Sequence, residues 1–152
     1  MSISAETYAR VALEDPHGNW ELVCGQLRRK PGMTARHNEI AWRFVAELTL
    51  QLDRKRFSVR MNAGHLWVSA RYFYVPDVIV VPRELVLQQQ EADPNGIESY
   101  RAALPLVIEI WSPSTGDYDV ETKLPDYQQR GDAIVEPLAL PGVRIALTAL
   151  FE

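Results

Sequence analysis

The sequence predicts an α/β domain in which helices flank a mixed central sheet. Three observations lead to this fold class. One long segment carries apolar residues at helical spacing, several short segments alternate apolar and polar residues as strands do, and turn-forming residues separate them. The 152 residues are enough for one buried core, so we expect a single domain over residues 1–152.

The amino-terminal part is expected to form a helix followed by a hairpin. Residues 4–14 read as a short helix with Ser4 as its N-cap, and the turn formers at 15–19 end it. Residues 20–29 alternate apolar and polar side chains around Gly25, which predicts a hairpin with its turn at that glycine.

The long helix is predicted from Thr34, its cap, to about Leu52. Its apolar residues form one stripe that we assign to the core: Ile40, Ala41, Phe44, Val45, Leu48 and Leu52. Alternation and β-branched residues then predict a series of strands, and a surface helix follows them. The strands are expected at residues 57–61, 66–70, 72–75 and 78–81, and the helix at 83–92.

The central strand is expected at residues 104–111, which are almost entirely apolar. A helix follows from about 119 to 130, and Gly131 is its expected C-terminal cap. Because Pro125 fits only the first turn of a helix, the regular part should begin near Thr122. We expect the apolar residues 140–151 to pack as a final strand or short helix.

Composition excludes several classes of protein. A net charge of −4 argues against binding to nucleic acid by bulk charge, although a local basic groove or a bound metal could outweigh it. Cys24 is the one cysteine, so no internal disulfide is possible. No apolar run approaches membrane-spanning length, and residues 1–12 do not resemble a secretory signal. We therefore expect a cytoplasmic protein with no membrane partner.

Two acidic residues stand where apolar residues would be expected. Glu109 lies inside the central strand, and Asp77 immediately precedes the strand at 78–81. A buried carboxylate needs a metal, a cation, a proton or a hydrogen-bond network. Glu109 could instead face solvent or pair with an arginine. If the two strands are neighbours, however, both acids could share a divalent cation, and Lys123 could hold or activate a water beside it.

An ordered set of motifs resembles the Uma family of restriction endonucleases, in the PD-(D/E)XK nuclease superfamily. The matching pieces are Trp20-Glu21-Leu22-Val23-x-Gly25, His37-Asn38-x-Ile40, Pro76-Asp77, Val107-Ile108-Glu109-Ile110, Ser112-Pro113-Ser114-Thr115, Lys123-Leu124-Pro125-x-Tyr127 with Gly131, and Leu140-Pro141-Gly142-Val143. The resemblance spans nearly the whole chain. It implies a restriction-endonuclease-like fold and metal-dependent hydrolysis of DNA phosphodiester bonds by a bacterial protein. We also expect a homodimer.

The resemblance also implies roles for individual residues. Asp77 and Glu109 would bind Mg²⁺ or Mn²⁺ with the carbonyl group of Ile110, and Lys123 would orient the attacking water. Three residues are expected around this set: Glu21, His37 and Asp119, the last as a partner of Lys123. For each of them a structural reading is open too, since Glu21 could face solvent and His37 could simply cap its helix or lie on the surface.

The chain departs from the family pattern in three places. Trp111 stands two residues after Glu109, where the superfamily has its lysine, so Lys123 is the substitute. Lys30 and Lys55 are less well placed to reach the strand ends. Cys24 and Gln26 replace two acids that usually flank the hairpin glycine. Against the family pattern we also expect the domain to be shortened after about residue 133, either because a segment is deleted or because residues are absent from this sequence.

Rival interpretations follow from these departures. Lys123 could be a solvated residue paired with Asp119 or Glu121, an arrangement of little energetic weight. The shortened carboxy-terminal half favours a non-catalytic binding or assembly protein that keeps the nuclease fold. A metal-dependent hydrolase of another substrate is a third reading.

Overall fold

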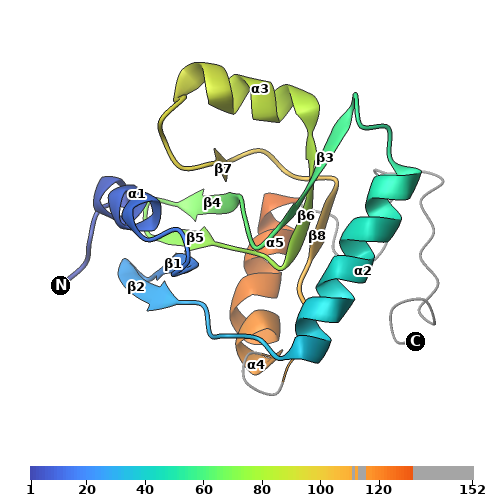
Figure 1. Cartoon of the computed structure of the whole chain (residues 1–152). Coiled ribbons are helices and arrows are strands. Elements are labelled where there is room, and N and C mark those ends of the chain that lie inside the picture. Colours follow the sequence, from blue (N-terminus) through green and yellow to red (C-terminus); the bar gives the residue numbers. More distant parts are fainter. Residues whose placement is uncertain (111, 113–115, 132–152) are drawn as a thin grey trace.

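The computed structural model of the chain describes residues 1–110, 112 and 116–131 (Figure 1). In chain order the elements are α1 (Ala5–Glu14), β1 (Trp20–Val23), β2 (Gln26–Arg29), α2 (Ala35–Gln51), β3 (Phe57–Met61), β4 (His65–Ser69), β5 (Tyr72–Tyr74), β6 (Val78–Pro82), α3 (Arg83–Ala92), β7 (Ser99–Tyr100), β8 (Leu106–Ile108), α4 (Gly116–Tyr118), the π-helical turn η1 (Asp119–Lys123) and α5 (Leu124–Arg130). Mixed α/β architecture and the amino-terminal helix and hairpin are confirmed.

The described strands form two sheets. Five strands pair in the order β2-β1-β5-β4-β7, and three pair in the order β3-β6-β8. The first sheet is mixed, because β7 runs parallel to β4 while the other pairs are antiparallel. The sequence did not predict β7, which has only two residues and no alternation to read.

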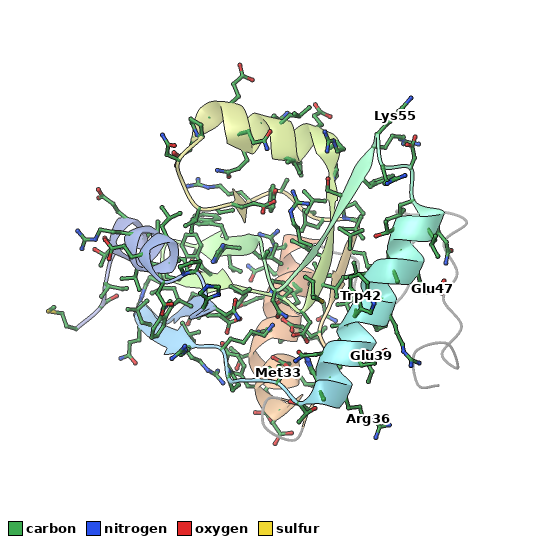
Figure 2. All side chains as sticks on the ribbon, in the orientation of Figure 1. Met33, Arg36, Glu39, Trp42, Glu47 and Lys55 are labelled. Carbon is green, nitrogen blue, oxygen red and sulfur yellow. The ribbon has the colours of Figure 1, made fainter. Side chains whose placement is uncertain are left out.

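Helices cover the two faces of the three-stranded sheet (Figure 1). The apolar stripe of α2 packs on one face, where Ile40, Ala41 and Leu48 meet Val78 and Val80 of β6. The stripe is therefore core, as predicted. The outer side of α2 carries polar residues and Trp42, whose side chain is 56% exposed (Figure 2).

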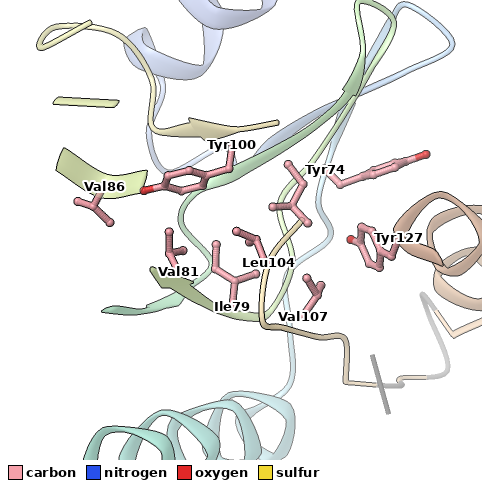
Figure 3. Close-up of a cluster of buried hydrophobic side chains, with 9 residues drawn as sticks. Tyr74, Ile79, Val81, Val86, Tyr100, Leu104, Val107 and Tyr127 are labelled. Carbon is pink, nitrogen blue, oxygen red and sulfur yellow. The ribbon is translucent and has the colours of Figure 1, made fainter. Parts of the chain in front are cut away.

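The opposite face of this sheet packs against α5 and α3. Ile79 and Val107 lie in this second cluster with Tyr127 of α5 and Tyr74 of β5, so the cluster joins both sheets (Figure 3). The rings of Tyr74 and Tyr127 meet edge to face, with centroids 5.9 Å apart. The cluster thereby fixes α5 beside the end of β8.

Local signals place the helix ends where the sequence predicted them. The side chains of Ser4 and Thr34 accept the backbone N–H groups of Thr7 and His37, which caps α1 and α2. The hairpin turn uses positive φ at both Cys24 (φ 53°) and Gly25 (φ 75°), a conformation in which glycine carries no steric cost.

The last helical segment differs from the prediction. Helical structure begins at Gly116, earlier than expected, and passes through η1, where the N–H of Leu124 donates to the carbonyl of Asp119. Pro125 then lies at the start of α5. The wide turn before the proline accommodates its missing N–H group, so the helix continues past it. Gly131 ends α5 with φ 84°, as predicted.

Some expectations fall outside the described residues. These are the packing of residues 140–151, the shortening after about residue 133, Trp111 and most of the Ser-Pro-Ser-Thr motif. Among the helices that the structure describes, none is long and apolar enough to cross a membrane.

Candidate active site

The two unusual acids lie at the adjoining ends of two neighbouring strands. Strands β6 and β8 pair antiparallel, with Val78 opposite Ile108. Asp77 directly precedes Val78 and Glu109 directly follows Ile108, so continuing this register brings the two acids to corresponding positions at one end of the sheet. The predicted adjacency of the strands is confirmed, and the shared cation stays a prediction.

Asp77 is buried and bonded through both carboxylate oxygens. Its Oδ1 accepts from Lys30 Nζ at 2.7 Å, and its Oδ2 accepts from the backbone N–H of Ile110 at 2.7 Å. His37 Nε2 lies 3.1 Å from the same Oδ2. Asp77 therefore ties the start of β6 to the end of β8, to the first turn of α2 and to the residue after β2.

Glu109 is held in place by residues of α5 and η1. Its Oε1 accepts from the hydroxyl of Tyr127 at 2.6 Å and from Lys123 Nζ at 3.1 Å. Its Oε2 is buried and has no hydrogen-bond partner among the described residues. One oxygen is thus fixed by the protein, and the other is free to bind an additional group.

Lys123 is buried at the centre of three carboxylates. Its Nζ lies 2.7 Å from Glu21, 3.1 Å from Glu109 and 3.5 Å from Asp119, and its side chain is 2% exposed. Glu21 is itself buried and also accepts the backbone N–H of Val75 at 3.0 Å. The lysine is consequently part of a buried charge network, not a solvated surface residue.

The pKa values of these groups reflect competition between burial and neighbouring charge. Burial acts to raise the pKa of Asp77, but Lys30, the N–H of Ile110 and His37 outweigh it and hold that pKa below its ordinary value. Burial raises the pKa of Glu109 to about 7, against the lowering effect of Lys123. For Lys123, burial opposes the charge, but the surrounding acids outweigh it and raise its pKa.

Two pockets meet at this network. Asp77 lines a cavity of about 10 Å³ together with Glu21, Arg28, Lys30, Pro31, Met33, Tyr118, Asp119 and Lys123. This is about the space of a single water molecule. Glu109 lines a larger and more apolar pocket of about 200 Å³, with Val107, Ile108, Asp119, Val120, Leu124 and Tyr127. Asp119 borders both pockets. Figure 2 shows Met33 just before the start of α2.

The residues fit a hard divalent cation only in part. Across the residues that the structure describes, no three His, Cys, Asp or Glu side chains group closely enough to hold a metal ion. Mg²⁺, however, commonly uses one or two carboxylates and keeps several waters. Glu109 Oε2 is the open oxygen for such a cation, while both oxygens of Asp77 already have protein partners.

The structure brings together every side chain that the sequence singled out for the site. Asp77, Glu109, Lys123, Glu21 and Asp119 all belong to the contacts above. His37 belongs to them too, because its imidazole is buried against Asp77. Its alternative role as a cap or surface residue does not hold, since Thr34 is the cap.

Sequence reasoning missed two contacts of the acids. From the sequence, Lys30 is less well placed than Lys123 to reach the strand ends, yet it binds Asp77, because the chain leaves β2 directly towards the start of β6. Tyr127 was noted only as part of a motif, yet its hydroxyl binds Glu109. Its spacing of four residues after Lys123 is the signal that could have found it, since such residues share a helix face.

Comparison with known proteins identifies a family and solved structures with a similar fold. The family model Uma2, described as "Putative restriction endonuclease", matches residues 5–133. A crystal structure of a "putative nuclease" from Anabaena variabilis ATCC 29413 has a TM-score of 0.58 and 18% sequence identity. The aligned region covers 74% of this chain and 62% of that chain, so this chain spans less than two thirds of its length. No curated protein matches.

The likeness to the Anabaena protein shows the fold. The family match covers most of the 152 residues, including Asp77, Glu109 and Lys123. The chain belongs to the Uma2 family of nuclease-like proteins.

Proposed function

We propose that this chain is a metal-dependent endonuclease that hydrolyses DNA phosphodiester bonds. Asp77 and Glu109 are the proposed ligands of Mg²⁺ or Mn²⁺, with the carbonyl group of Ile110. A bound cation would polarise the phosphoryl oxygen and lower the pKa of a coordinated water. Family membership and the nuclease-like fold support this function, and the charge of the buried site supports the cation.

The observation that carries the proposal is an excess of buried negative charge. Four carboxylates, those of Glu21, Asp77, Glu109 and Asp119, surround two buried lysines. When all are ionised, this set carries two more negative than positive charges, which one divalent cation would balance. Burial is the main cause of the raised pKa of Glu109, about 7, and a cation bound at this acid would favour its ionised form.

Each residue has a separate task in this proposal. Glu109 presents its free Oε2 while Tyr127 and Lys123 fix its Oε1. Lys123 orients the attacking water and steadies the charge that develops on the phosphate. Glu21 and Asp119 hold the ammonium group of Lys123 in place.

A nuclease assay tests the proposal directly. The whole chain is incubated with plasmid DNA and with single-stranded DNA, with Mg²⁺ or Mn²⁺ or with a chelator. We expect cleavage that requires the cation and that Glu109→Ala abolishes. Glu39→Ala, an exposed acid on α2, is the matched control and should cleave as the parent does. Cleavage that survives in Glu109→Ala would remove this site from the reaction.

One observation favours the alternative of a non-catalytic protein that retains the fold. Both oxygens of Asp77 are engaged by protein groups, as they would be in a purely structural acid. Titration with Mn²⁺ separates the two functions. A binding or assembly protein has no need of a cation at Asp77 and Glu109, whereas the nuclease must bind one there.

A further inference from the structure

Lys30 is a fully engaged, buried lysine inside the candidate site. Its side chain is 5% exposed. Its Nζ donates to the carbonyl of Val75 and to Asn62 Oδ1, each at 2.9 Å, and to Asp77 Oδ1 at 2.7 Å. An ammonium group has three donors, and all three of Lys30 have acceptors. The lysine is thus fixed in a single position against Asp77.

The two proposed metal ligands differ in how many of their carboxylate oxygens already have partners. Oδ1 of Asp77 accepts from the ammonium group of Lys30, and Oδ2 accepts from the backbone N–H of Ile110. Glu109 has donors on Oε1 only, and its buried Oε2 has no partner among the described residues. A divalent cation would therefore find one open oxygen at Glu109 and would have to share Asp77 with Lys30.

Charge makes this sharing unfavourable. Lys30 lines the same small cavity as Asp77, Asp119 and Lys123, and its charge also lowers the pKa of Glu109. A positive group this close to both acids repels a second cation in a site that is shielded from solvent. It also satisfies the charge of Asp77 when no cation is bound, which a buried carboxylate requires.

We propose that Lys30 is the internal counter-ion of Asp77 and sets the affinity of the site for a divalent cation by competing for Asp77 Oδ1. Lys30 is a positioning residue in this role. It holds Asp77 and the start of β6 in place without metal, and it keeps cation binding weak. The inference rests on the proposed function, because it takes Asp77 and Glu109 as the ligands.

Calorimetric titration with Mn²⁺ tests the competition without any measure of cleavage. The whole chain is compared with Lys30→Gln, which removes the charge but keeps an amide donor, and with Lys30→Arg, which keeps the charge. We expect Lys30→Gln to bind Mn²⁺ about tenfold more tightly than the parent, or better. Lys30→Arg should bind no more tightly than the parent. Lys55→Gln, beyond the far end of α2 in Figure 2, is the matched control and should not change the affinity.

Two further measurements separate this role from that of a structural lysine. In an Asp77→Asn background, Lys30→Gln should no longer increase the affinity. Without metal, Lys30→Gln should lower Tm, and saturating Mn²⁺ should raise its Tm by more than it raises that of the parent. An equal rise in both proteins, or tighter binding by Lys30→Arg, would overturn the competition.

The outcomes also distinguish this inference from the proposed function. If the parent and Lys30→Gln bind Mn²⁺ with the same Kd, the metal site stands and the role of Lys30 is wrong. If neither protein binds Mn²⁺, the metal site itself is wrong, and the role of Lys30 falls with it.

Discussion

Replacing Glu109 by glutamine tests whether the burial of this acid costs stability. The pKa of Glu109 is raised from 4.5 to about 7, chiefly by burial. Between these two pH values the folded protein holds a proton that the unfolded chain releases. The free energy of unfolding of the parent therefore falls as the pH rises from 4.5 to 7, and the whole loss is present above pH 7.

The size of the effect follows from the two pKa values. At about 1.4 kcal/mol for each pKa unit, the difference between 4.5 and 7 corresponds to a loss on the order of 3 kcal/mol. Glu109→Gln has no such proton to lose, and its side chain can still accept from Lys123 and Tyr127. The free energy of unfolding of the variant, minus that of the parent, should therefore rise by about this amount across the same interval.

Urea unfolding in the presence of a chelator, followed by circular dichroism at a series of pH values, measures this difference. Glu39→Gln is the control, because it removes the same charge from an exposed position on α2. Its effect should stay within about 0.5 kcal/mol at every pH. The free energy of unfolding of Glu109→Gln minus that of the parent should not stay constant from pH 4.5 to pH 7, nor fall with rising pH. Either result would refute the assigned cost of burial.

Two other substitutions test the contacts of Glu109. Lys123→Ala should abolish cleavage of plasmid DNA but leave Mn²⁺ binding by the acids measurable in a calorimeter, and Lys123→Arg should restore only part of the activity, because its planar fork cannot place a single ammonium donor on the water. Cleavage at the parent rate by Lys123→Ala would exclude the lysine from the mechanism. Tyr127→Phe should lower the free energy of unfolding in urea by about 1–2 kcal/mol, since a hydrogen bond to a carboxylate is lost. The loss should be larger above pH 7 than below pH 4.5, and a loss that does not depend on pH would mean that the hydroxyl does not stabilise the ionised form of Glu109.

The sequence predicts the fold well where a local rule decides the structure. The stripe of α2, the caps at Ser4 and Thr34 and the hairpin at Gly25 all follow from short-range chemistry. Prediction from the sequence is less successful where contacts between distant parts of the chain decide the structure. Strand β7 exists because β4 lies beside it, and two residues carry no pattern of their own.

The same distinction applies to the site. An acid in an apolar strand is visible in the sequence, and this signal identified Asp77 and Glu109. The partner of such an acid is not visible, because Lys30 is 47 residues from Asp77 and Lys123 is 14 residues from Glu109. The position of Lys123 after the central strand and the resemblance to a family both indicated this lysine, whereas nothing in the sequence indicated Lys30.

Tyr127 belongs at once to the hydrophobic core and to the candidate site. Its ring packs against Tyr74 in the cluster that joins the two sheets (Figure 3). Its hydroxyl binds Glu109. A substitution in this part of the core that tilts the ring of Tyr127 therefore also moves the hydroxyl that donates to Glu109. Changes in core packing would in this way alter the candidate site. Natural selection on activity would then also preserve core packing around Tyr127, and we expect the pairing of Tyr74 with Tyr127 to change slowly during evolution wherever Glu109 is kept.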